Sequence, residues 1–206
     1  EISACLVGSE MCIRDRNEGC KVATLGPLIH NPQAVEDMQK KGALVADAIA
    51  DVPAGYEVVI RSHGVPRIVY DELDARGITY HDATCPFVQK IQRIAAEAEK
   101  AGAVLLVAGD KTHPEVQGIR GWAGEQVTVV QTPEDAERFE LPDKDQKVCI
   151  VAQTTFNYNK FKELVEIISK KRYDIVVLNT ICNATKERQT EALSLIHISE
   201  PTRQAE

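Results

Sequence analysis

The sequence predicts an α/β fold made of repeated parallel-sheet α/β units. Short β-branched or apolar segments alternate with longer amphipathic segments, which is the order expected of parallel strands connected by helices. Proline or glycine stands at most of the changes from one kind of segment to the other. The segment AVLLVAG at 103–109 is apolar throughout, as expected for a strand that a parallel sheet buries on both faces.

In the first half of the chain, strands alternate with helices. We expect the strands at residues 20–25, 43–47, 56–61 and 78–81. The helices are expected at residues 32–42, 66–77 and 86–101. Gly42 and Gly77 end the first two helices, because glycine readily takes the left-handed conformation that is common after a helix. The third helix repeats apolar side chains at helical spacing, namely Val88, Ile91, Ile94 and Ala95.

The second half repeats the same alternation. Strands are expected at residues 103–109, 126–131, 147–153 and 174–180. One helix begins at Pro114 and another spans 157–171, and we assign no element between residues 131 and 147. Because a new run of strands starts after the helix that opens at Pro86, we divide the chain into units at 17–85 and 86–180, with a third beginning at 181–192.

Both ends of the sequence lack a strand or helix pattern. Residues 1–16 and 193–206 resemble translated adapter sequence, so we expect them to be non-native and leave them out of the fold prediction. This exclusion removes Cys5, Cys12 and His197 from the candidate site residues.

Composition and charge describe an ordinary globular chain. It has 206 residues, 44% of them hydrophobic and 27% charged, and its net charge of −7 disfavours binding to nucleic acid or to anionic membranes. No apolar run approaches the ~20 residues that span a bilayer, and no signal-peptide pattern occurs. The six cysteines are scattered without a CxxC motif, so we expect reduced thiols or metal ligands and a cytoplasmic location.

Four times a chemically capable residue stands just ahead of a proline where a strand leads into a helix. The four residues are His30, His63, Cys85 and His113. Proline is favoured at the first helical position, and the residue before it is held extended. Each candidate therefore lies at the carboxyl end of a strand, where open α/β sheets bind ligands and where helix N–H groups favour anions. Together they indicate one site assembled from several units.

The residue types at these junctions allow several kinds of chemistry. Cys85 opens a helix, a position that favours thiolate, and Cys182 has the matching place after the last strand, so the pair is a candidate for metal ligation as well as for core packing. The three histidines could clamp a phosphate or diphosphate, or could be solvated loop residues. Glu115 could deliver protons if its pocket is dry, and Thr154 could donate a hydroxyl hydrogen bond.

Several segments, taken together and in order, resemble one family. They are TLGPLIHNP (24–32), RSHGVP (61–66), DATCPFVQK (82–90), THPEVQG (112–118), AQTT (152–155) and ICNATKERQ (181–189). The family is LytB, the 4-hydroxy-3-methylbut-2-enyl diphosphate reductases, which act last in the non-mevalonate isoprenoid pathway. The resemblance extends over residues 20–192. It implies three α/β units around a central [4Fe–4S] cluster, of which about two are present in this chain.

The resemblance implies that the cluster is held by three thiolates, two of them from Cys85 and Cys182. One iron then stays open for the substrate's hydroxyl, in the way that an open position makes a zinc site catalytic. Ferredoxin or flavodoxin would supply the two electrons. The intact enzyme is expected to be a monomer.

The resemblance also assigns the remaining candidates. His30, His63 and His113 match histidines that contact the substrate, chiefly its diphosphate. Thr154 matches a hydroxyl that helps to position the substrate, and Glu115 matches the acid that supplies protons for the loss of water. The implied products are isopentenyl diphosphate and dimethylallyl diphosphate.

Two parts of the family pattern have no match in this sequence. The family's first cluster cysteine lies in a Gly-Phe-Cys-Ala-Gly motif near its N-terminus, and we do not transfer that role to Cys12. A Ser-x-Asn segment and a later serine, both on the diphosphate, would lie beyond residue 192. We therefore expect the chain as written to lack one cluster ligand and to be inactive, although its parent gene encodes the reductase.

From the residues alone, two other functions stay open. His30, His63 and His113 could bind one metal ion, with Glu115 as the base of a hydrolase. The chain could also be a phosphate-binding module without catalysis. Metal analysis separates the enzymes, because iron with labile sulfide is expected of the reductase and one zinc ion of the hydrolase.

Overall fold

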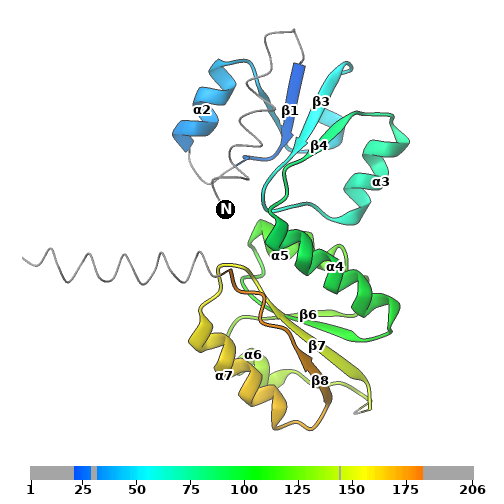
Figure 1. Ribbon diagram of the computed structural model, residues 1–206, viewed down its shortest axis with the longest axis vertical. Helices are drawn as coiled ribbons and strands as arrows, with labels where there is room; N and C mark the ends of the chain where they lie inside the picture. The colour runs from blue at the N-terminus through cyan, green and yellow to red at the C-terminus, as the bar shows by residue number, and fades with distance from the viewer. Residues whose placement is uncertain (1–20, 29–31, 144, 183–206) are drawn as a thin grey trace, which may run out of the picture.

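The computed structural model describes residues 21–28, 32–143 and 145–182, which form two four-stranded sheets with helices packed against them (Figure 1). All strand pairs in both sheets are parallel. The predicted α/β class, with about two units present, is therefore confirmed. The segments 1–16 and 193–206 and the candidate His30 lie outside the described residues. Within the described part of the chain, no helix combines the length and the apolar character needed to cross a bilayer.

The first sheet has the strand order β2-β1-β3-β4. Its strands are β1 (Lys21–Leu25), β2 (Leu44–Ala46), β3 (Tyr56–Ile60) and β4 (Tyr80–Asp82). The connections contain α2 (Pro32–Lys40), the short 3₁₀ helix η2 (Ile49–Asp51) and α3 (Arg67–Ala75). Val58 and Ile60 of the central strand β3 are fully buried in one cluster with Leu73 of α3. The predicted alternation of apolar strands and amphipathic helices thus forms the first sheet and the helices that pack against it.

The second sheet has the strand order β6-β5-β7-β8. Its strands are β5 (Val104–Ala108), β6 (Val127–Val130), β7 (Lys147–Ala152) and β8 (Asp174–Val177). Its helices are α4 (Pro86–Lys100), α5 (Pro114–Arg120), α6 (Pro133–Arg138) and α7 (Tyr158–Ser169). Helix α4 follows β4 directly, yet Ile91 and Ala95 of this helix belong to the same buried cluster as Leu105 and Val107 of β5. This packing agrees with a unit that begins near residue 86, although the boundary itself stays a prediction.

The two sheets have the same strand order, so each strand of the first has a counterpart in the second. Strand β1 corresponds to β5, β3 to β7 and β4 to β8. Parallel strands place their carboxyl ends at one edge of a sheet, where ligands bind in open α/β folds. Cys85 after β4 and Cys182 after β8 therefore occupy equivalent connections. The same holds for His63 after β3 and Thr154 after β7.

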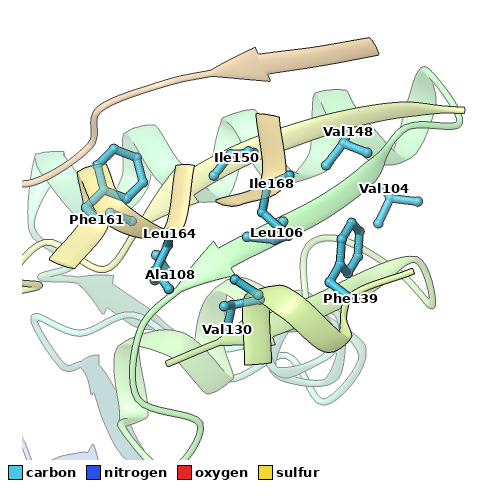
Figure 2. Packing of buried hydrophobic residues seen from close by; sticks show 12 residues of the cluster. Val104, Leu106, Ala108, Val130, Phe139, Val148, Ile150, Phe161, Leu164 and Ile168 are labelled. Atoms are coloured by element: carbon cyan, nitrogen blue, oxygen red, sulfur yellow. The ribbon is translucent and has the colours of Figure 1, made fainter. Parts of the chain in front are cut away.

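The core of the second sheet explains why its central strand is apolar throughout. On one face, Leu106 of β5 and Ile150 of β7 pack with Leu164 and Ile168 of α7 (Figure 2). On the other face, alternate residues of β5 pack with α4 and α5. Helices therefore cover both faces of the sheet, as the sequence of β5 predicts.

Leu106 offers a direct test of this core. Replacing Leu106 by alanine should lower the free energy of unfolding by about 2–5 kcal/mol, because the substitution removes buried methyl groups and leaves a cavity. Urea denaturation of the full chain measures this change. The control is Ile68→Ala, because Ile68 is 71% exposed and its truncation should change the free energy of unfolding by less than about 0.5 kcal/mol. Equal effects of the two substitutions would contradict the packing described here.

Helix α6 and strand β8 differ from the prediction for identifiable reasons, and the short 3₁₀ helix η2 was not predicted either. Helix α6 was not predicted, because its six residues are too few to show a helical period. The feature that marks the start of α6 is a capping box. In it the Thr132 hydroxyl accepts a hydrogen bond from the Asp135 N–H, and the Asp135 carboxylate accepts one from the Thr132 N–H. Strand β8 ends at Val177 rather than at residue 180, because the Thr180 side chain, not its backbone, bonds the N–H and carbonyl of Ala152.

Candidate functional site

A buried carboxyl group lies where helix α5 begins. Glu115 is in the first turn of this helix and is only 2% exposed. Pro114 occupies the first helical position, as expected from its fixed backbone angle. His113 caps the helix, and its Nδ1 atom accepts a hydrogen bond from the Glu115 N–H at 3.2 Å. The start of α5 thereby fixes the backbone on both sides of Glu115.

Thr154 holds both oxygens of the Glu115 carboxyl group. Its backbone N–H donates to Oε1 and its hydroxyl donates to Oε2, each at 2.7 Å. Thr154 follows β7, which pairs with β5 up to the register position of Ala108 and Ala152. Because the two strands are parallel and end together, their register brings Thr154 and Glu115 into contact from 39 positions apart.

Burial and hydrogen bonding act on the pKa of Glu115 in opposite directions. Burial raises the pKa by disfavouring the charged form, whereas the two hydrogen bonds from Thr154 lower it by stabilising the carboxylate. Burial is the larger effect, so the pKa lies above its ordinary value. A carboxyl group of this kind can keep a proton at higher pH and pass it to a bound molecule.

The raised pKa makes stability depend on pH in a predictable direction. Between the ordinary carboxyl pKa of about 4.3 and the higher pKa of the folded chain, the folded state binds more protons than the unfolded state. The contribution of Glu115 to stability is therefore greatest below the unfolded pKa and is lost as pH rises through the folded pKa.

Glutamine at position 115 has no charge to bury and lacks this dependence. The free energy of unfolding of Glu115→Gln minus that of the parent chain should increase as the pH is raised from about 4 to about 8. Urea titrations of both chains across this range measure the difference. A difference that stays constant or decreases with pH would mean that the pKa of Glu115 is not raised by folding.

His63 and His113 come from different sheets and lie in contact. Their ring centroids are 5.4 Å apart, and the rings meet edge to face at 77°. His63 lies in the connection after β3, and His113 lies between β5 and α5. The structure therefore brings these two candidates together, and His113 links the pair to Glu115.

Cys85 and Cys182 occupy equivalent connections but differ in exposure. Cys85 is partly exposed at the start of α4, and its N–H donates to the Ser62 carbonyl at 2.9 Å. Cys182 is 4% exposed, and its N–H donates to the Thr154 carbonyl at 2.9 Å. The backbone of Cys85 thus lies beside the loop that carries His63, and that of Cys182 lies beside Thr154. Neither cysteine forms a disulfide with another described residue.

Among the described residues, no group of three or more His, Cys, Asp or Glu side chains is arranged to hold a metal ion. The three-histidine metal site considered from the sequence includes His30, which is outside those residues. Cys149 is within β7 and packs against the core, where burial raises the pKa of its thiol.

Sequence reasoning missed the residue that joins the two sheets beside this site. Trp122 lies just after α5, and its Nε1–H donates to the Val65 carbonyl of the first sheet's loop at 3.0 Å. The sequence gives little indication of this role for Trp122, which is the single tryptophan of the chain and follows Gly121. Nothing in its spacing indicates a contact with a residue 57 positions earlier.

Comparisons with known proteins agree with the resemblance. The family model described as LytB protein matches residues 8–200. A relative from Thermoanaerobacter sp. (strain X514), named 4-hydroxy-3-methylbut-2-enyl diphosphate reductase, is 41% identical over 180 residues, which are 86% of this chain and 62% of the relative. A relative of the same name from Clostridioides difficile (strain 630) is 41% identical over 174 residues, with coverage of 84% and 62%. The chain thus spans about three fifths of the length of these relatives.

Two solved structures share the fold. A structure titled as the E-1-hydroxy-2-methyl-but-2-enyl-4-diphosphate reductase from Plasmodium falciparum aligns with a TM-score of 0.83 at 25% identity, covering 91% of this chain and 59% of that one. A second structure, titled (E)-4-hydroxy-3-methyl-but-2-enyl diphosphate reductase, the terminal enzyme of the non-mevalonate pathway, aligns with a TM-score of 0.76 at 34% identity, covering 93% and 68%. These similarities do not favour the hydrolase or the binding module.

Proposed function

Since the chain belongs to the LytB family, we propose that it forms part of a reductase that converts 4-hydroxy-3-methylbut-2-enyl diphosphate into isopentenyl and dimethylallyl diphosphate. The observation that carries this proposal is the buried Glu115 carboxyl group, which both donors of Thr154 hold. Reductive removal of a hydroxyl group requires an acid, and this carboxyl group has the raised pKa that such an acid needs.

The chemistry of the proposed reaction determines which groups the site must provide. The carbon–oxygen bond of the substrate breaks, the oxygen leaves as water, and the allylic product gains a hydrogen. This conversion consumes two electrons and two protons for each substrate. An enzyme that catalyses this conversion needs a proton donor beside the departing oxygen. It also needs hydrogen-bond donors that hold the diphosphate away from the reacting carbon.

We assign the proton supply to Glu115 and Thr154. Oε1 of Glu115 accepts from the Thr154 backbone, which leaves Oε2 as the oxygen that exchanges a proton with the Thr154 hydroxyl over 2.7 Å. When Glu115 is protonated on Oε2, this hydrogen bond reverses, and the Thr154 hydroxyl can then donate to a bound molecule. Burial favours the protonated form and therefore supports this relay.

We assign the diphosphate to the histidines. His63 and His113 lie together at the meeting of two sheet edges, and an imidazole at such an edge donates a hydrogen bond to a phosphate oxygen in either charge state. His30 completes this group in the proposal. Its connection follows β1, the counterpart of β5, so its place in the repeat matches that of His113.

Cys85 and Cys182 are the residues that we propose as ligands of a [4Fe–4S] cluster. The donor chemistry fits, because soft thiolates are the usual ligands of such clusters and both thiols follow equivalent strands. A further ligand would come from outside the described residues. When bound, the cluster would supply the electrons and an iron that takes the substrate's hydroxyl.

The remaining parts of the proposal concern the setting of the enzyme. Electrons would come one at a time from ferredoxin or flavodoxin in the cytoplasm, and the intact enzyme would be a monomer. The chain would supply two of its α/β units, at 17–85 and 86–180, and the beginning of a third at 181–192.

The test of this function uses a chimera, because the chain spans 62% of its Thermoanaerobacter relative. In the chimera, residues 21–182 of this chain replace the matching part of the relative. Under anaerobic conditions with a one-electron reductant, it should convert the substrate into isopentenyl and dimethylallyl diphosphate, separated by chromatography. Release of inorganic phosphate without these products would contradict the proposal.

A further inference from the structure

Helix α5 contacts the first sheet's loop almost backbone to backbone. A methyl group at Gly118 would lie 3.5 Å from the carbonyl oxygens of His63 and Gly64, an ordinary van der Waals distance. A methyl group at Gly121 would lie 2.8 Å from Cα of Pro66 and closer still to its Cβ, a distance that real side chains do not adopt. Glycine at 121 is therefore required for the helix to approach this loop.

Trp122 secures the same contact at the end of the helix. Besides the hydrogen bond from its Nε1–H to the Val65 carbonyl, its ring meets the Tyr70 ring edge to face, with centroids 5.7 Å apart. Two contacts fix the position of the Tyr70 side chain: its hydroxyl donates a hydrogen bond to Asp82 at 3.1 Å, and its ring contacts the ring of Tyr80. We call Gly118, Gly121 and Trp122, with the loop 63–66 and Tyr70 on which they pack, the α5 joint.

We propose that Trp122 is a positioning residue, which acts through the α5 joint to keep His113 against His63. Helix α5 has seven residues and is about 10 Å long, so a displacement at Trp122 is carried to the other end as a rigid body. That other end holds His113 and Glu115. The loop on which the joint packs begins with His63, so one short helix sets the distance between two histidines from different sheets. Its importance for catalysis rests on the function proposed above.

The experiment compares two glycine substitutions on one helix. Gly121→Ala should force α5 away from Pro66, whereas Gly118→Ala, the matched control, introduces the same methyl group at an ordinary contact distance. Because Trp122 is the single tryptophan of the chain, its fluorescence reports directly on the joint. The emission of the full chain should move to longer wavelength in Gly121→Ala and stay unchanged in Gly118→Ala.

Nuclear magnetic resonance then measures the distance that the joint is proposed to set. In the full chain with ¹³C-labelled histidine, a cross-peak between the ring protons of His63 and His113 is expected, and the variants His63→Asn and His113→Asn assign it. Gly121→Ala should abolish the cross-peak and Gly118→Ala should retain it. Trp122→Phe, which keeps a ring against Tyr70 but removes the N–H donor, should weaken it without unfolding the chain. Persistence of the full cross-peak in both Gly121→Ala and Trp122→Phe would overturn the proposal.

Binding of inorganic diphosphate separates this inference from the function on which it rests. If both hold, calorimetry should show that Gly121→Ala weakens diphosphate binding about tenfold or more, as expected for a lost hydrogen bond to a charged group. Loss of the cross-peak with unchanged diphosphate binding would uphold the joint and overturn the assignment of the histidines to the diphosphate.

Discussion

Replacing Glu115 by glutamine in the chimera should reduce turnover by about 10²–10⁴-fold, the usual contribution of a positioned acid. Glutamine has nearly the same shape and can still accept the Thr154 N–H, but it cannot release a proton. Binding of inorganic diphosphate, measured by calorimetry, should stay within a factor of about two, because the proposed diphosphate donors are the histidines. Product formation under anaerobic single-turnover conditions measures the loss.

The control for this substitution is Glu97→Gln. Glu97 is exposed on α4, so the same chemical change there should leave turnover unaltered. If Glu115→Gln retained full turnover, the acid of the reaction would have to be a different residue. If it lost diphosphate binding together with turnover, the substitution would have disturbed the site, and the separation of proton supply from diphosphate binding would be wrong.

Replacing Cys85 or Cys182 by serine in the chimera should remove turnover below detection. Loss of one thiolate is expected to prevent stable incorporation of an iron–sulfur cluster, because serine is a harder and more weakly bound ligand. The broad visible absorbance of the anaerobically purified chimera should fall in both variants. Metal content by emission spectroscopy measures the same loss.

Cys149→Ala provides the matched comparison, because Cys149 is the remaining described cysteine and packs within β7. It should keep both the absorbance and the turnover of the chimera, at a stability cost of about 1 kcal/mol or less. Equal iron loss in all three variants would point to a general folding defect. Undiminished iron in Cys85→Ser or Cys182→Ser would exclude that residue as a ligand.

Local sequence patterns predicted the fold well, because each strand and most helices are marked by residues whose preferences are local. The apolar run at β5 predicted burial on both faces, and Leu105 and Leu106 do pack on opposite sides. Proline marked the starts of α4 and α5, where Cys85 and His113 occupy the N-cap positions. These features need no knowledge of distant residues.

The contacts that build the candidate site could not be predicted in the same way. The pairing of Glu115 with Thr154 depends on the register between β5 and β7, and the local sequence of neither residue encodes that register. The contact of His63 with His113 depends on how α5 packs against the loop of another sheet. Residue types and their places at strand ends predicted which side chains are candidates, but only packing brings them into contact.

The metal content of the anaerobically purified chimera distinguishes a reductase from the hydrolase that the same residues would allow. About four iron and four labile sulfide per chain, in a brown protein, are the expected result. A single zinc ion without labile sulfide would contradict the proposed reductase and would assign the histidines and Glu115 to hydrolytic chemistry.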